Sequence, residues 1–505
     1  MDKKSAPSLS RAEAFKIVIV GILLLMAVLQ VIVYEFNAIS SLDSSQKSAP
    51  SDLFIYQGAN EKDSVTFDNK KLLPEKIAYS FSDEFSGVVS NSNESVSELY
   101  EGIEPLISAV FSSDAECVKL GDVAGRTLWH GACESNEYVY IKYHGEFPFP
   151  LIYAYANEEK NVLISSVASG DMPKIGDMFI KLCRGSDAEI QSGLEDHVGK
   201  FYAIGHTEDG KYSLFISQKG DGDIDFSKSA FETYTDFADA SAIKFVEKDK
   251  SAALFPFEEI YRGISVGPSL AFFDCKDLQN ADTVVRRDAN ENDVFDKETL
   301  DELSSSVFAV DHSAAYSEID GRYTYVDVQS ELAINSEKIS YSSDSGIDIG
   351  LFLKYRVLER GYGIIDKVKA SGEFADKVRE LLPTAFCGLA DLKLSDVYEE
   401  DGGNGAIVVK YSFFLQNIRI NCEDVTVKIV NDKIVFAEIP LISFEKGSAS
   451  YILLQSAVFA AAAIKNEQVS DFEKIKDKTL SAVVLEYDKS EDETEYKCSW
   501  KLIWN

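Results

Sequence analysis

The longest apolar run of the chain lies close to its N-terminus and contains no charged residue. It extends from Ile17 to Tyr34, eighteen positions, which reaches the usual lower length of a helix that spans the hydrocarbon of a bilayer. A cleaved signal peptide has a shorter apolar core followed by a small-x-small site, and the residues from Asn37 to Ser40 offer only a weak one. The pattern therefore predicts an uncleaved transmembrane helix that anchors the protein.

Basic residues are distributed unevenly about this apolar run. The next basic residue after it is Lys47, whereas the tail before it carries Lys3, Lys4, Arg11 and Lys16. Positively charged flanks of a membrane helix stay on the cytoplasmic side. We therefore expect a single-pass protein of the cell membrane, with a cytoplasmic N-terminus and an extracellular C-terminal bulk.

One face of the predicted membrane helix repeats at helical spacing and carries Ile19, Leu23, Ala27, Gln30 and Tyr34. Such a seam is suited to packing against a partner helix, and Gln30 would then hydrogen-bond across it in a medium that offers few polar groups. Alternatively, Gln30 lies near the outer interface and reaches water. The sequence leaves both interpretations open.

Helical and strand patterns alternate through the rest of the chain. A capping-box pattern starts a helix at Ser95, and apolar residues follow it at helical spacing. Strand alternation covers Tyr138 to Tyr143, a turn-like segment follows from Gly145 to Pro150, and β character continues from Leu151 to Tyr155. The segments 201–205 and 212–216 flank an Asp-Gly turn and predict a hairpin.

Two further groups of short alternating strands resemble each other in style, since each combines a β-meander with a helix. The first has a helix over 298–307, strands over 315–318, 323–328, 332–334 and 339–341, and a helical stretch near 374–382. The second has a strand over 406–415, a hairpin of 425–430 with 434–439, a helix over 450–464, and strands from 482 onward. The last strand places Tyr496, Cys498, Trp500, Leu502 and Trp504 on one face, as expected for a half-buried strand.

These elements predict an α+β protein: a single N-terminal transmembrane helix followed by a multidomain ectodomain of antiparallel β-meanders backed by helices. A chain of 505 residues is too long for one hydrophobic core. The predicted parts are a cytoplasmic tail (1–16), a membrane helix (17–34), a serine-rich stalk (35–51), an N-terminal ectodomain (52–260), a central β-meander domain (261–395) and a C-terminal α+β domain (396–505).

The composition adds limits on the partners and on the compartment. The formal charge of −34 repels nucleic acid and anionic lipid from the main body, so we expect no nucleic-acid partner. The seven cysteines are scattered, and no pair has the Cys-x-x-Cys spacing of a zinc or redox motif. Buried free thiols are the expectation, with one bridge between Cys117 and Cys133 as the alternative.

Candidate chemistry is sparse, and each motif departs from its pattern. Ser265 stands in a Gly-x-Ser-x-Gly sequence, but the surrounding chain shows β-meanders in place of the parallel sheet that a nucleophile elbow requires. The segment from Asp221 to Glu232 spaces its carboxylates like a calcium loop, yet Phe226 takes the place of the essential glycine.

The acidic segment from Asp488 to Glu495 is predicted to be a solvated hairpin tip. No pair of the five histidines has metal-ligand spacing. We expect no catalytic residues, no metal and no cofactor.

Three stretches of the chain come in a characteristic order: 138–155 with its Phe-Pro-Phe-Pro sequence, 299–343 with Phe308-Ala309-Val310-Asp311, Asp320-Gly321 and Tyr323-Thr324-Tyr325, and the terminal unit from Ala406 onward. This order of features resembles the YycH family of membrane-anchored accessory regulators. One departure is the segment from Leu415 to Ile418, which lacks the Gly-aromatic-Pro turn of that family.

The resemblance implies a function without catalysis. It implies an extracytoplasmic regulator that contacts a WalK-like sensor histidine kinase through its membrane helix, together with a YycI-like companion, and so controls cell-wall metabolism through a two-component system. The alternative from the residues is an extracellular binding module that captures a peptide or a cell-wall fragment beside an aromatic sheet.

Overall fold

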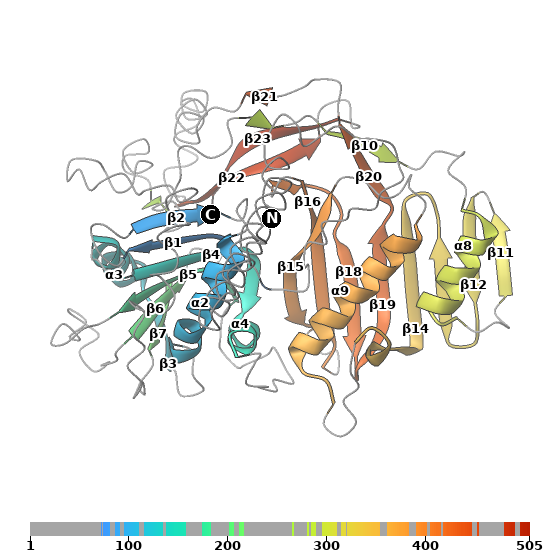
Figure 1. Cartoon of the computed structure of the whole chain (residues 1–505), viewed down its shortest axis with the longest axis horizontal. Helices are drawn as coiled ribbons and strands as arrows, with labels where there is room; N and C mark the ends of the chain where they lie inside the picture. The colour runs from blue at the N-terminus through green and yellow to red at the C-terminus, as the bar shows by residue number, and fades with distance from the viewer. Residues whose placement is uncertain are drawn as a thin grey trace, which may run out of the picture. The chain divides into compact units, whose positions relative to one another are not determined.

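The computed structural model describes part of the chain, and all described residues belong to one compact unit within 66–505. The described residues are 72, 74–80, 86–90, 95–110, 116–134, 138–157, 174–182, 201–206, 212–216, 265–266, 280–281, 284–288, 295–310, 315–319, 321–353, 361–382, 390–400, 405–415, 418–446, 452–453, 479–489 and 495–504. Two mainly antiparallel sheets, each covered by helices, account for most of them (Figure 1).

The first sheet pairs its strands antiparallel in the order β2-β1-β4-β5-β6-β7-β3. Their bounds are β1 Pro74–Ser80, β2 Ser86–Ser90, β3 Glu116–Leu120, β4 Tyr138–Pro148, β5 Lys174–Leu182, β6 Phe201–His206 and β7 Tyr212–Ile216. The predicted pairing of 201–205 with 212–216 is confirmed as β6 and β7.

Helix α2 (Ser95–Val110) covers one face of the first sheet and begins where its capping pattern predicts. The sequence predicts an apolar stripe of Val96, Leu99, Ile103, Leu106 and Val110, and the last four of these are buried. Helix α3 (Asp122–Glu134) contributes Trp129, which packs edge-on against the rings of Tyr140 and Phe179. Tyr140 and Phe179 point to the face of the sheet that α3 covers, whereas their neighbours along β4 and β5 point to the other face and share a core with α2. Helices therefore cover both faces of the first sheet.

Helix α4 (Phe149–Tyr155) occupies the segment for which β character was predicted from Leu151 to Tyr155, so that prediction is wrong. Pro148 is extended at its N-cap and Pro150 lies in its first turn, where a missing backbone N–H does no harm. Almost every residue of α4 is buried. A short segment that is buried on all sides shows a continuous apolar sequence in a helix and in a strand alike, so its sequence does not distinguish the two.

The second sheet contains an antiparallel run in the order β11-β12-β13-β14-β19-β18-β16-β15. Its strands are β11 Ala315–Ile319, β12 Arg322–Val326, β13 Ser330–Ile334, β14 Lys338–Asp348, β15 Asp391–Glu399, β16 Ile407–Leu415, β18 Val425–Val430 and β19 Lys433–Pro440. The four predicted meander strands are confirmed as β11 to β14, and the predicted hairpin as β18 and β19. Asn431 and Asp432 form its two-residue turn with positive φ, which these short polar side chains tolerate.

Helix α9 (Ile364–Leu381) and helix α8 (Lys297–Glu302) cover one face of this sheet (Figure 1). The predicted helix over 298–307 is confirmed, with its second half wound as a π-helix, η4 (Leu303–Val307). The predicted helix near 374–382 is the C-terminal half of α9. The rings of Phe308 and Phe352 pack edge-on against Phe374, so α8–η4 and α9 share one core.

The remaining strands of the second sheet include the C-terminal hairpin of β22 (Thr479–Lys489) and β23 (Glu495–Trp504). β22 also pairs in parallel with β17 (Ile418–Ile420) and with β8 (Ser265–Val266), and β23 meets β10 (Val284–Asp288), which pairs with β20 (Ile442–Lys446). In β23, Tyr496 and Cys498 are buried while Lys497 and Ser499 are exposed, so the predicted alternation is confirmed at this end.

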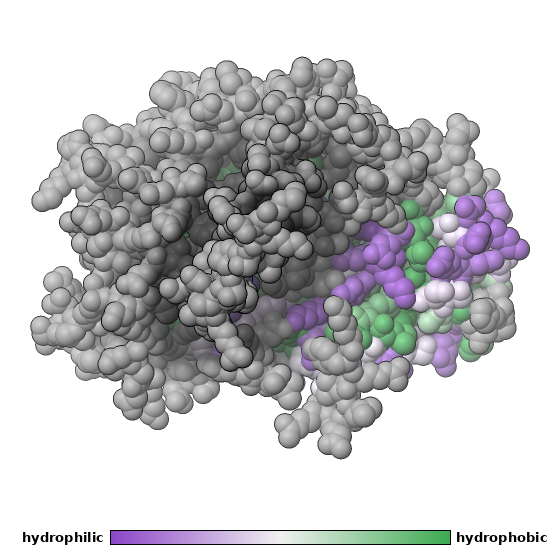
Figure 2. Space-filling view, viewed as in Figure 1, coloured by the Kyte–Doolittle hydropathy of each residue, from purple (hydrophilic) through white to green (hydrophobic). Residues whose placement is uncertain are grey.

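A helix was predicted over 450–464, but its start is wrong because Ile452–Leu453 form strand β21, paired with β9 (Asn280–Ala281). The rest of that segment lies outside the described residues. The predicted domain boundary at 395/396 falls inside β15, and β14 of the predicted central domain pairs with β19 of the predicted C-terminal domain. The domain scheme stays a prediction. Figure 2 shows hydrophilic residues at the end of the sheet that holds α8 and β11, next to residues of intermediate and hydrophobic character.

Candidate functional site

The residues predicted to carry the membrane contact lie outside the part of the chain that the structure describes. They are the ends of the anchor, Ile17 and Tyr34, and the seam of Ile19, Leu23, Ala27 and Gln30. Within the described ranges, no helix is both long enough and apolar enough to cross a bilayer. The anchor and its seam therefore stay predictions.

The weak catalytic and metal motifs of the sequence are only partly described. Ser265 lies in the two-residue strand β8 and pairs with Thr479, whereas the serine of a nucleophile elbow sits on a sharp turn after its strand. The calcium-like segment from Asp221 to Glu232 is outside the described residues. Among the described residues, His, Cys, Asp and Glu form no group suited to a metal ion. Cys117 is a free thiol, so the alternative bridge to Cys133 does not form.

The most concentrated polar chemistry lies where the two sheets meet, at a contact between β4 and β15 that we call the sheet junction. Glu146 of β4 pairs in parallel with Asp396 of β15, so β4 belongs to both sheets. Lys174 Nζ, from β5, lies 2.7 Å from Asp396 Oδ1 and 4.7 Å from the ring centre of Tyr398. One ammonium group thus contacts both an anion and an aromatic face of β15.

Gly145 is the point of closest approach in the sheet junction. A Cβ atom built on Gly145 would lie 1.9 Å from the carbonyl oxygen of Ser395. No side chain fits in that space, so only glycine allows the two backbones to come this close. The ladder between β4 and β5 is interrupted at the same place, between Lys142 and Phe147, which lets β4 leave one sheet for the other.

His144 and Lys393 meet beside this glycine. Lys393 Nζ lies 3.4 Å from His144 Nε2 and 5.0 Å from the ring centre of Phe414, and the His144 ring packs edge-on against Phe414. Lys393 is 4 % exposed. Burial lowers the pKa of Lys393 to about 8, although Asp391 and Glu75 act in the opposite direction.

The pKa of His144 is lowered to about 3, first by burial and then by the charge of Lys393, while Glu75 acts against this. The imidazole is therefore neutral at physiological pH. On the β1 side, Lys142 Nζ lies 2.9 Å from Glu75 Oε2. Burial raises the pKa of Glu75, but the charges of Lys142 and Lys76, joined by that of His144 once this imidazole is protonated at acidic pH, outweigh it and lower the pKa to about 2.

Among the described residues, a buried lysine with a lowered pKa beside a neutral histidine is the arrangement that comes nearest to an acid–base site. Its surroundings favour a structural role, because the lysine faces the ring of Phe414 and its charge is balanced by Asp391 and Glu75. His144 and Lys393 are 249 residues apart in sequence. No local pattern signals that they meet, and sequence reasoning missed the junction for that reason.

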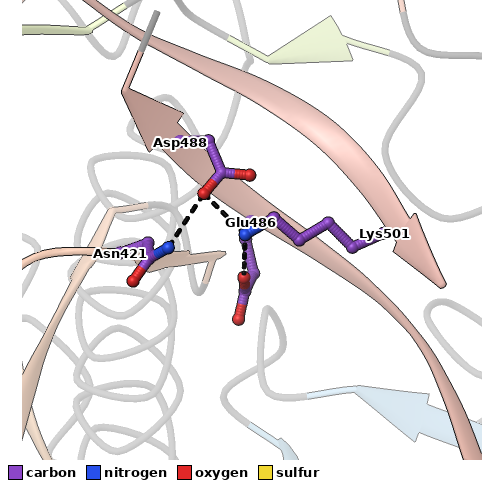
Figure 3. Close-up of polar contacts among 4 residues, drawn as sticks. All are labelled: Asn421, Glu486, Asp488 and Lys501. Atoms are coloured by element: carbon purple, nitrogen blue, oxygen red, sulfur yellow. Dashed lines mark hydrogen bonds and ion pairs between the residues drawn. The ribbon is translucent and has the colours of Figure 1, made fainter. Parts of the chain in front are cut away.

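A second polar cluster fixes β17 to the C-terminal hairpin (Figure 3). Lys501 Nζ donates to Asp488 Oδ1 at 2.6 Å and to Glu486 Oε2 at 3.0 Å, and Asn421 Nδ2 donates to the same Asp488 oxygen. Burial lowers the pKa of Lys501, but these two carboxylates outweigh it, so the net pKa is raised. Asp488, predicted to begin a solvated loop, is thus part of β22 and is ion-paired.

Comparisons with known proteins give two distant structural likenesses. No protein-family model matches the chain, and no curated protein matches it. The crystal structure of YycH from Bacillus subtilis aligns with a TM-score of 0.39 and 12% identity, covering 86% of this chain and 94% of that one. An uncharacterized protein from Eubacterium rectale ATCC 33656 aligns with a TM-score of 0.28 and 14% identity, covering 45% of this chain and 78% of that one. Similarity at these levels establishes neither a common function nor a common partner.

Proposed function

We propose that the protein is a non-enzymatic, membrane-anchored regulator that acts by protein–protein contact. Its anchor is the helix over 17–34, its bulk lies outside the cell, and its partner is a WalK-like sensor histidine kinase of a two-component system that controls cell-wall metabolism. The observation that carries the proposal is the uncharged run from Ile17 to Tyr34, with four basic residues in the sixteen positions before it and none after it until Lys47.

The sensor kinase enters the proposal through the resemblance of the motif order to the YycH family. In the membrane, the seam formed by Ile19, Leu23, Ala27 and Gln30 would bind one signalling state of the kinase more tightly than the other. A ligand shifts a two-state equilibrium only by its difference in affinity for the two states. The described ectodomain supplies a folded α+β body outside the membrane, and a YycI-like companion is a second expected partner.

Replacing Gln30 with leucine should weaken the association with the kinase in the membrane. Interhelical hydrogen bonds in membranes contribute about 1 kcal/mol, so the bound fraction should fall by roughly five-fold. The measurement is co-purification of the kinase with the tagged full chain in mild detergent. The matched control is Ile32→Leu, which changes a residue on the opposite side of the helix, since each residue advances by about 100°.

The control variant should retain the kinase fully. Equal recovery of the kinase with wild-type protein and with Gln30→Leu would reject the seam, and it would favour the interpretation in which Gln30 reaches water.

A further inference from the structure

Strand β11 ends the second sheet and is exposed along its whole length. All five of its residues, Ala315 to Ile319, are exposed, and among the described residues β11 pairs with β12 alone. Figure 1 shows it beside β12 at the end of the sheet, with α8 in front. An exposed edge strand is a template for the addition of another strand, and proteins that avoid this place charged residues (above all lysine), proline or a bulge there. The described residues of β11 include no lysine, proline or bulge, and Glu318 is their one charged residue.

The hairpin register determines which backbone groups of β11 face outward. Ile319 pairs with Arg322 across a two-residue turn, and the closing pair of such a hairpin exchanges both of its hydrogen bonds. Hydrogen-bonded and non-hydrogen-bonded pairs alternate along an antiparallel ladder. Tyr316 and Glu318, which oppose Tyr325 and Tyr323, are therefore the residues whose N–H and C=O groups point away from β12.

The helix-covered side of this edge carries negative charge. Glu318 accepts a hydrogen bond from the hydroxyl of Tyr316, and the exposed carboxylates of α8 lie on the same side of the sheet. The charge of Asp301 reaches both Tyr316 and Tyr325. Burial is the first cause that raises the pKa of Tyr325 to about 12, and Asp301 adds to it. The exposed acidic residues of α8 and its N-cap are Asp296, Glu298, Asp301 and Glu302, against one lysine, Lys297.

The opposite side of the same edge carries aliphatic side chains among uncharged polar ones and Arg322, because Ser317, Thr324 and Arg322 share that face. Ile319 of β11 is 68% exposed and Val326 of β12 is 43% exposed, and their alternation places them on the face away from Tyr316 and Tyr325. Val328, just beyond β12, is 99% exposed. A strand added to β11 would thus have carboxylates beside one row of its side chains and aliphatic groups beside the other.

We propose that β11 is a docking edge for an extended strand of a partner protein in which basic and aliphatic side chains alternate. The outward backbone groups of Tyr316 and Glu318 supply the hydrogen bonds, the acidic side takes the basic side chains, and Ile319 and Val326 take the aliphatic ones. This contact lies in the ectodomain and is additional to the proposed contact in the membrane. A second copy of this chain fits the edge less well, because each copy carries a formal charge of −34.

The test uses the full chain in phosphatidylcholine nanodiscs and a labelled, end-blocked octapeptide of alternating lysine and valine. Fluorescence anisotropy measures its Kd for wild-type protein and for two variants, Glu318→Pro and Glu318→Ala. Both variants lose the same carboxylate, but only proline removes the outward N–H, and it leaves the ladder to β12 intact. The Kd should be at least ten-fold higher for Glu318→Pro than for Glu318→Ala. A glutamate–valine octapeptide should bind at least ten-fold more weakly to wild-type protein.

Hydrogen exchange on the wild-type protein provides a readout that does not depend on folding of the proline variant. Bound lysine–valine peptide should slow exchange of the amides of Tyr316 and Glu318. Equal Kd values for the two variants, protection only elsewhere, or equal binding of the two octapeptides would overturn the proposal. So would a dimer of the full chain that Glu318→Pro dissociates, since the occupant would then be a second copy. The docking edge and the membrane contact can fail separately. A variant of β11 that loses the peptide but still co-purifies with the kinase affects the docking edge alone.

Discussion

Replacing Gly145 with alanine should strongly lower the thermal stability of the protein. The new Cβ atom would lie 1.9 Å from the carbonyl oxygen of Ser395, and a backbone atom cannot rotate away as a side chain can. β4 and β15 must separate, which weakens the ion pair between Lys174 and Asp396 and the contact between His144 and Lys393. Overpacking of this kind costs about 3 kcal/mol.

The matched control is Gly131→Ala in helix α3, where the added Cβ atom meets no atom within 4 Å. Alanine is the better helix former by about 1 kcal/mol, so this variant should be neutral or slightly stabilised. Thermal unfolding followed by circular dichroism in nonionic detergent compares the two. A midpoint for Gly145→Ala equal to that of Gly131→Ala would show that the sheet junction does not constrain the fold.

Replacing Lys393 with methionine should change how stability depends on pH. The pKa of Lys393 is lowered from 10.5 to about 8 in the folded protein, which corresponds to about 3 kcal/mol against folding while the lysine is charged in both states. Between pH 8 and pH 10.5 the unfolded chain holds this proton and the folded chain does not. The unfolded state then binds more protons, so this lysine makes the stability rise with pH across that window.

Methionine fills a similar volume without a charge, so Lys393→Met should be at least as stable as the wild type below pH 8. The stability advantage of Lys393→Met over the wild type should shrink by about 3 kcal/mol as the pH rises to 10.5. Deprotonation of Lys393 removes the cost of a buried charge from the folded wild type, and methionine never carries that charge. The exposed Lys497 provides the control, since Lys497→Met makes the same substitution on the solvated face of β23. Parallel curves of midpoint against pH for wild type and Lys393→Met would contradict the burial of a titrating lysine.

Local patterns predicted those parts of the fold that local physics determines. The stripe of Leu99, Ile103, Leu106 and Val110 identified α2, because a helix on a sheet must bury one face. Period-two alternation and two-residue turns likewise identified the strands from β11 to β14 and the β18–β19 hairpin. Helix α4 was missed because burial on all sides erases the periodicity that distinguishes a helix from a strand.

The sheet junction and the docking edge depend on contacts that no local pattern contains. Gly145 was interpreted as part of a turn, and its need to be glycine arises from Ser395, far along the chain. The exposure of β11 follows from the order of strands in the sheet, in which β14 pairs with β19 and leaves β11 at the other end. Strand order is set by tertiary packing, so the sequence predicted the strands and not which of them forms the edge.

The central claim, regulation through contact inside the membrane, is tested most directly by exchanging the predicted anchor. Residues 17–34 are replaced by an unrelated single-span helix of equal length, and output of the two-component system is measured in cells with the kinase present. The account predicts that regulation is lost while the ectodomain keeps its thermal midpoint and its binding of the lysine–valine octapeptide. Full regulation by the exchanged protein would contradict the account and would favour a binding module that acts through its ectodomain alone.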